Sequence, residues 1–119
     1  MSTSLLWSVA LAVAFAVSAP AKETVYKLTI AEQLVNITGE PVMAMTLNGG
    51  IPGPVLRFTE GDTAVIHVRN DLSESSSIHW HGMLLPPGMD GVPFISFPPI
   101  QPATTFTYRF KIRQKGTYW

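Results

Sequence analysis

The segment TAVIHVRN, residues 63–70, alternates apolar and polar side chains with a period close to two. In an extended chain Ala64, Ile66 and Val68 fall on one face, and His67 falls on the other. This alternation is typical of a β-strand that has one face in a core and the other face in solvent. The segment therefore predicts a half-buried strand of an all-β domain.

The same pattern recurs in residues 104–113, where Phe106, Tyr108 and Phe110 share one face and Thr, Arg and Lys side chains share the other. Elsewhere, β-branched and aromatic runs are separated by Gly, Pro, Asn and Asp, which predicts further strands joined by turns. We expect the strands to pair antiparallel in a sandwich or barrel. The complete expected set is residues 24–37, 42–47, 55–59, 63–70, 77–84 and 104–113.

Residues 85–102 contain six prolines and are incompatible with a central strand. They predict a long ordered loop, and such loops in compact domains are often functional. A Greek-key sandwich normally needs about seven strands, which is more than the expected set provides. Either one edge of the sheet is open or the sequence is a fragment of a longer protein.

Residues 5–17 are mostly apolar and lead to Ala19-Pro20-Ala21, a small-residue cleavage signal. Residues 1–21 therefore predict a secretory signal peptide, and residues 22–119 one exported domain, periplasmic or secreted. The apolar run is short for a membrane span, so we expect no membrane contact after cleavage. Residues 1–4 carry no Lys or Arg, which leaves a retained anchor as the alternative.

The charge and cysteine content exclude several classes of function. Eight basic and eight acidic side chains balance, so there is no basic excess to attract nucleic acid or an anionic membrane. The chain has no cysteine. Disulfides, thiol nucleophiles and thiolate-bound metal sites are therefore excluded within it.

Residues 77–82, SIHWHG, place two of the three histidines one residue apart. On a strand His79 and His81 share one face, and Trp80 points to the other, toward the core. The simplest interpretation is a pair of partly exposed histidines. The pair can also chelate one zinc ion with a third ligand, or serve two neighbouring metals, because the backbone separates the residues by about 6.6 Å. Imidazole suits zinc and copper alike, so the ligand type leaves these alternatives open.

Three segments together resemble a known family. They are LNGGIPGPVLRFTEGDTAVIHVRNDL at 47–72, SIHWHGMLLPPGMDGVP at 77–93 and TFTYRFKIRQKGTYW at 105–119. In this order they resemble the first cupredoxin domain of the multicopper oxidases, most closely the bacterial periplasmic copper-resistance branch. The resemblance implies a cupredoxin-like Greek-key β-sandwich that is incomplete at its C-terminus.

The resemblance also implies a role for the histidines. In this family the first His-x-His pair serves a trinuclear copper cluster, which reduces dioxygen to water with electrons drawn through a distant type 1 copper. Matched by motif, His79 binds the type 2 copper and His81 one type 3 copper. Asp90 matches an acidic residue thought to deliver protons to the cluster. The alternative for Asp90 is an ordinary turn residue before Gly91.

The family needs further histidine pairs and a cysteine-containing type 1 site, which this chain lacks. We therefore expect the N-terminal part of a laccase-like oxidase that is inactive by itself. Its partners would be the remaining cupredoxin domains, dioxygen, and a phenol-like or metal-ion substrate. The alternatives are a stand-alone exported copper-binding module and a one-metal zinc protein.

Other candidate ligands are less favoured. His67 matches no ligand of the family and is expected on the strand surface. Met43, Met45, Met83 and Met89 have the thioether chemistry of a copper(I) site, but they lack a tight repeated spacing. We expect most of the four to fill gaps in the core.

Overall fold

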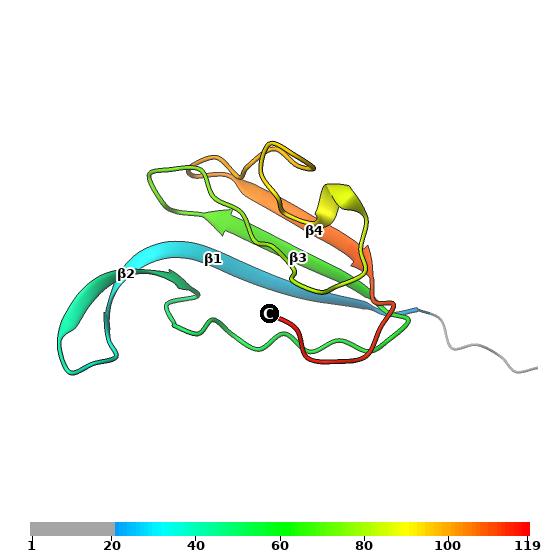
Figure 1. The fold of residues 1–119 in the computed structure, drawn as a ribbon, viewed down its shortest axis with the longest axis horizontal. Coiled ribbons are helices and arrows are strands. Elements are labelled where there is room, and N and C mark those ends of the chain that lie inside the picture. The colour runs from blue at the N-terminus through cyan, green and yellow to red at the C-terminus, as the bar shows by residue number, and fades with distance from the viewer. Residues whose placement is uncertain (1–20) are drawn as a thin grey trace, which may run out of the picture.

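The computed structural model describes residues 21–119, and it is all-β with one short 3-10 helix (Figure 1). The signal peptide predicted over residues 1–21 lies outside the described residues, apart from Ala21. In residues 21–119, no helix is both long enough and apolar enough to cross a membrane. The elements are β1 (Glu23–Asn36), β2 (Pro41–Leu47), β3 (Thr63–Asn70), η1 (Pro87–Met89) and β4 (Thr105–Lys111).

The four strands form one sheet in the order β2-β1-β3-β4. β1 pairs antiparallel with β2, and β3 pairs antiparallel with β4, as predicted. The prediction of antiparallel pairing throughout was wrong for β1 and β3, which run parallel with Tyr26 opposite Ile66. The reason is the return of residues 48–62 to the beginning of β1, where the Thr63 N–H donates to the Lys22 carbonyl at 2.9 Å.

The core lies on one face of this sheet. Ala64, Ile66, Val68 and Tyr108 are fully buried on that face, as the alternation of β3 and β4 predicts. The segments that follow β2, β3 and β4 cover it (Figure 1). The segments after β3 and β4 contribute the buried side chains of Leu72, Trp80, Phe97, Ile100 and Ile112, and the segment after β2 contributes the partly buried Leu56 and Phe58. The second layer of the sandwich is thus made of extended segments rather than of a second hydrogen-bonded sheet within the described residues.

The prediction of a strand at residues 55–59 was wrong, because the side chain of Tyr26 bonds to this backbone where a neighbouring strand was expected. The Tyr26 hydroxyl donates to the Arg57 carbonyl at 3.1 Å and accepts from the Arg57 N–H at 2.9 Å. Phe58 packs edge-on against the Tyr26 ring, at a centroid distance of 5.4 Å. The segment is therefore extended and attached to the sheet without joining it.

Residues 85–102 form a loop, as predicted, which includes η1. The long connection from β3 to β4 is held by Asn70, which is fully buried. The Asn70 amide donates to the carbonyls of Glu74 and Ile100, each at 2.8 Å, and its oxygen accepts from the Leu72 N–H at 3.0 Å. One side chain thereby connects the start and the end of the connection.

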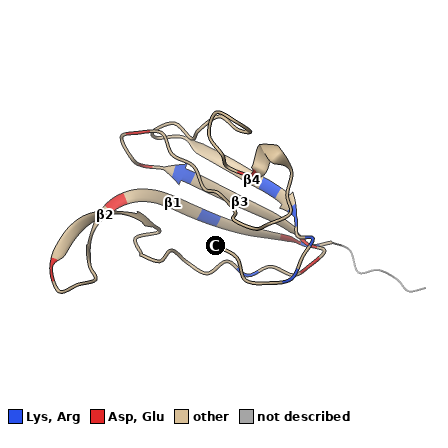
Figure 2. Ribbon diagram, in the orientation of Figure 1, with Lys and Arg blue, Asp and Glu red and all other residues tan. Residues whose placement is uncertain are grey.

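Lys27, Arg69 and Arg109 are exposed on the face of the sheet opposite the core, and Figure 2 marks the charged positions along the strands. Arg69 forms an ion pair with Asp71, and Arg109 forms one with Glu23. His67 lies on the same outer face, where its Nδ1 is 2.8 Å from the Thr107 hydroxyl. The position of His67 agrees with its prediction as a strand-surface residue.

The methionine prediction was right for two residues and wrong for two. Met83 and Met89 pack against the core. Met43 and Met45 are each 60% exposed. They lie on β2, where the β1–β2 hairpin extends beyond the segments that cover the rest of the sheet (Figure 1). All four methionines could lie in the core only if the covering segments extended to the end of the β1–β2 hairpin.

Candidate metal centre

His79 and His81 lie on residues 77–84, which we call the histidine segment. Their ring centroids are 5.5 Å apart, and the ring planes are inclined at 78°. Both residues are exposed, whereas Trp80 between them is buried in the core, so the side chains alternate as predicted. The rings therefore share a side of the segment, but they meet edge to face instead of lying parallel.

The prediction that the histidine segment is a strand was wrong, because its backbone bonds to side chains and loops instead of a ladder. The Ile78 N–H donates to the Tyr108 hydroxyl at 3.1 Å. Trp80 packs against the rings of Tyr108 and Phe110, at centroid distances of 5.3 and 5.7 Å. These contacts attach the start of the segment to the inner face of β4.

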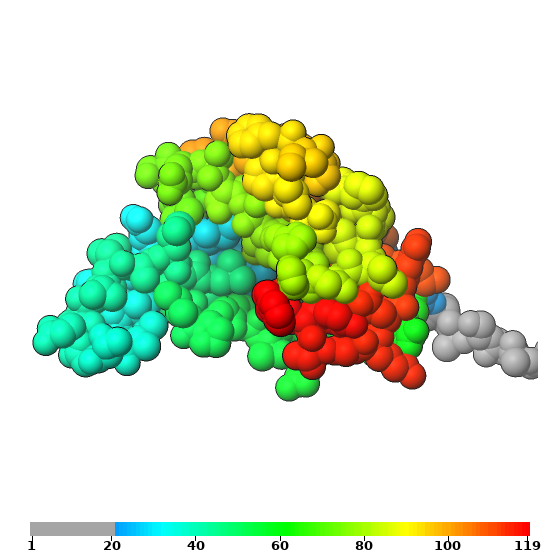
Figure 3. Space-filling view, in the orientation of Figure 1, coloured from blue at the N-terminus to red at the C-terminus, as the bar shows by residue number. Residues whose placement is uncertain are grey.

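The end of the histidine segment is held by residues 114–119 (Figure 3). The His81 N–H donates to the Trp119 carbonyl at 2.9 Å, and the His81 and Trp119 rings stack at 4.9 Å with a 9° inclination. The Gln114 amide donates to the Gly82 carbonyl at 2.9 Å and accepts from the Leu84 N–H at 2.6 Å. Both histidines are consequently carried on a backbone that is fixed at each end.

Asp90 lies next to His79, although eleven positions separate them in the sequence. The His79 Nδ1 is 2.8 Å from the Asp90 main-chain carbonyl and 3.4 Å from its carboxylate Oδ1. A carbonyl oxygen only accepts hydrogen bonds, so this contact requires the proton on Nδ1. In the neutral ring, Nε2 then keeps the free electron pair that a metal needs.

Sequence reasoning missed Tyr108 and Gln114 as residues that position the histidines. The alternation of β4 predicts that Tyr108 faces inward, but it does not identify the partner of the hydroxyl. Gln114 lies after β4, in a stretch without periodicity.

Burial raises the pKa of the Tyr108 hydroxyl, and the hydrogen bond from Ile78 opposes the rise. The hydroxyl therefore stays neutral in the physiological range.

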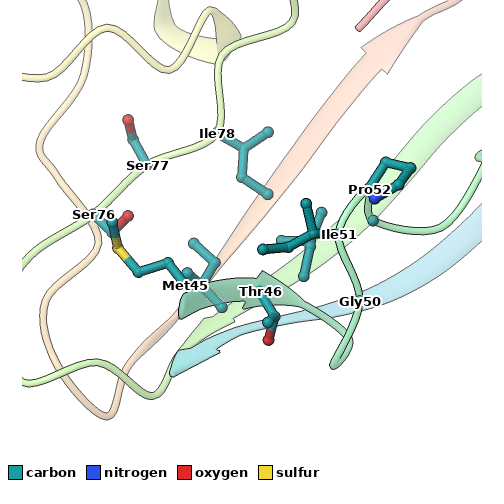
Figure 4. Close-up of a pocket in the computed structure, with 11 residues that line it drawn as sticks. Met45, Thr46, Gly50, Ile51, Pro52, Ser76, Ser77 and Ile78 are labelled. Atoms are coloured by element: carbon teal, nitrogen blue, oxygen red, sulfur yellow. The ribbon is translucent and has the colours of Figure 1, made fainter. Parts of the chain in front are cut away.

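Two hollows flank Ile78. The smaller, of about 260 Å³, is lined by apolar side chains and hydroxyls, with Ile51 facing Ile78 and Met45 beside Ser76 (Figure 4). It contains no titratable group. The larger, of about 670 Å³, is bordered by His79 and Trp80. Buried Trp80 Nε1 has no hydrogen-bond partner among the described residues.

Two imidazoles are fewer ligands than a stable metal site normally has. In residues 21–119, no group of three or more His, Asp or Glu side chains is arranged to hold a metal ion. A metal centre built on His79 and His81 therefore needs ligands from outside the described residues. The pair itself fits such a role, because both rings are exposed and His79 offers a free Nε2.

Comparison with known proteins identifies the relatives of this chain. The family described as multicopper oxidase matches residues 29–119. The copper resistance protein A homolog of Pseudomonas syringae pv. tomato is 59% identical over 96 residues, which are 81% of this chain and 16% of that protein. Copper resistance protein A of Escherichia coli is 55% identical over 103 residues, 87% of this chain and 17% of that protein. The chain thus spans about a sixth of the length of these relatives.

Solved structures agree with the fold. A multi-copper oxidase from Pseudomonas thermotolerans superimposes with a TM-score of 0.79 at 38% identity, over 83% of this chain and 24% of that one. A multicopper oxidase from Campylobacter jejuni, described as a metallo-oxidase, gives a TM-score of 0.74 at 38% identity, over 87% and 22%. The cupredoxin-like sandwich inferred from the three sequence segments is confirmed.

Proposed function

This chain belongs to the multicopper oxidase family, and on that premise we propose that residues 22–119 form the first cupredoxin domain of a larger oxidase. The larger protein couples one-electron oxidation of a substrate to four-electron reduction of dioxygen to water. Its role is in copper resistance, which the names of the two bacterial relatives support. His79 and His81 supply two ligands of the trinuclear copper site, and the remaining domains supply the others.

The donor set fits copper. Imidazole nitrogen is a common copper ligand, and the His79 ring has its Nδ1 proton engaged by the Asp90 carbonyl. Copper held by these rings would pass electrons, drawn from the substrate, to dioxygen. The two ring centroids are 5.5 Å apart on one side of the segment. We assign one copper to each ring, as the family resemblance implies.

Asp90 supplies protons in this proposal. Its carboxylate Oδ1 is 3.4 Å from His79 Nδ1, and its side chain is 34% exposed. The carboxylate therefore touches a ligand ring on one side and water on the other. Reduction of dioxygen to water consumes protons, which a carboxylate in this position can take up from solvent and release toward the site.

Export and partners follow from the same proposal. Removal of residues 1–21 would deliver the protein to the periplasm, where copper-resistance oxidases of this type would act. The reducing substrate is a phenol-like compound or a metal ion, oxidised in a part of the protein outside this chain. The other cupredoxin domains are the partners of the surface around His79 and His81.

The observation that carries the proposal is the exposed histidine pair with one ring fixed through Nδ1. The test is the copper content of the full-length protein with His79→Ala or His81→Ala. Each variant should lose copper and oxygen uptake, because no neighbouring imidazole among residues 21–119 can replace the lost ligand. His67→Ala is the matched control, since His67 lies on the opposite face of the sheet and bonds to Thr107.

The outcomes separate the alternatives. Full copper content in both cluster variants would refute the ligand assignment. Tight binding of copper by residues 22–119 alone would favour a stand-alone copper-binding module. Preferential binding of a single zinc ion by the full-length protein would favour the one-metal zinc protein.

A further inference from the structure

Gly91 lies against the backbone that carries His79. The glycine is buried and has φ of +71°, which side chains with a Cβ rarely adopt. A Cβ built on Gly91 would overlap the Ile78 carbonyl oxygen, would lie 2.7 Å from the Ile78 carbonyl carbon, and would lie 3.3 Å from the His79 nitrogen. Only glycine therefore allows the two stretches of backbone to approach this closely.

The turn that contains Asp90 and Gly91 is anchored independently of the histidines. It follows η1, where the Asp90 N–H donates to the Pro87 carbonyl at 3.1 Å. Met89 packs against the core, and its sulfur accepts from the Arg109 N–H of β4 at 3.3 Å. The position of the Asp90 carbonyl is thus set by β4 and by the contact at Gly91.

We propose that the Asp90 main-chain carbonyl, brought to His79 by the close approach at Gly91, is the group that orients His79 and presents its Nε2 to the metal. The proposal rests on the function proposed above, and it assigns Gly91 as a positioning residue. The carbonyl is closer to Nδ1 than the carboxylate is, at 2.8 against 3.4 Å. A main-chain acceptor also remains when the Asp90 side chain is replaced. Orientation of the ligand and transfer of protons are therefore separate tasks of the same residue.

The first measurement is the tautomer of His79 in the metal-free, full-length protein. Protein labelled with ¹⁵N in histidine distinguishes a protonated from an unprotonated ring nitrogen by NMR, at a pH where the ring is neutral. The expected result is a proton on Nδ1 and none on Nε2 in the wild-type protein. A proton on Nε2 would overturn the proposal.

The second measurement compares three variants by tautomer and by copper content. Gly91→Ala should lose the fixed tautomer and weaken copper binding at this site about tenfold or more, the usual cost of losing a partner that orients a ligand. Asp90→Ala should keep both, because the carbonyl remains. Gly61→Ala is the matched control: Gly61 also has a positive φ, +94°, but a Cβ there would meet nothing within 4 Å.

Each result decides the matter. Wild-type tautomer and copper content in Gly91→Ala would refute the role of the close approach. Equal losses in Asp90→Ala would transfer the role to the carboxylate. If Gly91→Ala does not fold, the wild-type tautomer and the Asp90→Ala result still decide. If the tautomers are as expected but the wild-type protein takes up no copper, the function proposed above fails while the orientation of His79 stands.

Discussion

The Tyr108 hydroxyl accepts a hydrogen bond from the Ile78 N–H at 3.1 Å, and this bond connects β4 to the residue that precedes His79. Tyr108 is fully buried. The histidine segment has no neighbouring strand at this point, so the hydroxyl is the only partner that the described residues give to this N–H. The position of His79 therefore depends on a side chain of another element.

Replacement of Tyr108 by Phe should destabilise the domain by about 1–3 kcal/mol, because a partly buried N–H loses its acceptor. The histidine segment should loosen most. Hydrogen–deuterium exchange of the full-length protein, followed by mass spectrometry of peptides that cover residues 76–84, measures this directly. Tyr26→Phe is the control, since it removes a hydroxyl that bonds to Arg57 in an exposed region. Equal exchange of residues 76–84 in both variants would contradict the prediction.

The Glu23–Arg109 ion pair should make a small, pH-dependent contribution to stability. The hydrogen bond from Arg109, aided by its charge, lowers the pKa of the Glu23 carboxyl. A lowered pKa means that the pair stabilises the folded state above the ordinary glutamate value of about 4.3, and that this contribution is lost as the pH falls through the lowered pKa. Both side chains are about half exposed, so the effect is limited by solvent and salt.

Thermal unfolding of Glu23→Gln between pH 7 and pH 3 tests this contribution. The variant should be slightly less stable than the wild-type protein at pH 7, and the difference should vanish in acid. Glu32→Gln is the control, because Glu32 makes no ion pair among residues 21–119. A difference between Glu23→Gln and wild type that grows in acid would have the wrong sign.

The sequence predicted the strands with clear alternation, and β3 was predicted over the residues it occupies, 63–70. Alternation reports which face of a strand is buried, but it does not report the direction of the neighbouring strand. The parallel pairing of β1 and β3 was therefore missed. The strand predicted at 77–84 was wrong for a related reason: its alternation is real, yet Tyr108 and Gln114 bond to its backbone where a ladder was expected.

The candidate site was predictable in its residue types but not in its contacts. The spacing of His79 and His81 on an extended chain was enough to place both rings on one side. The contact between His79 and the Asp90 carbonyl depends on the anchoring of η1 and on the absence of a side chain at Gly91. Neither condition leaves a periodic signal in the sequence.

The Phe94→Gly variant should be more stable than the Phe94→Ala variant. Phe94 has φ of +64°, a left-handed conformation that costs a residue with a Cβ about 1–2 kcal/mol. Phe94 is 87% exposed, so little packing is lost when its ring is removed. Phe94→Ala removes the ring and keeps the strain, so Phe94→Gly should be more stable than Phe94→Ala by about 1 kcal/mol. Thermal unfolding of the two full-length variants measures the difference, and an advantage for Ala would refute the strain.

Asp90→Asn should slow oxygen reduction while the copper content stays unchanged. Asn preserves the size of the side chain and leaves the main-chain carbonyl that bonds to His79, so the ligand should remain in place. An amide does not exchange a proton as a carboxylate does, and loss of such a group typically lowers the rate on the order of a hundredfold. Oxygen uptake and copper content of the full-length protein are the measurements.

Asp71→Asn is the control, because Asp71 pairs with Arg69 away from the histidines. Wild-type turnover with full copper would leave Asp90 only its main-chain contact to His79, and lost copper would show that the carboxylate also holds the ligand.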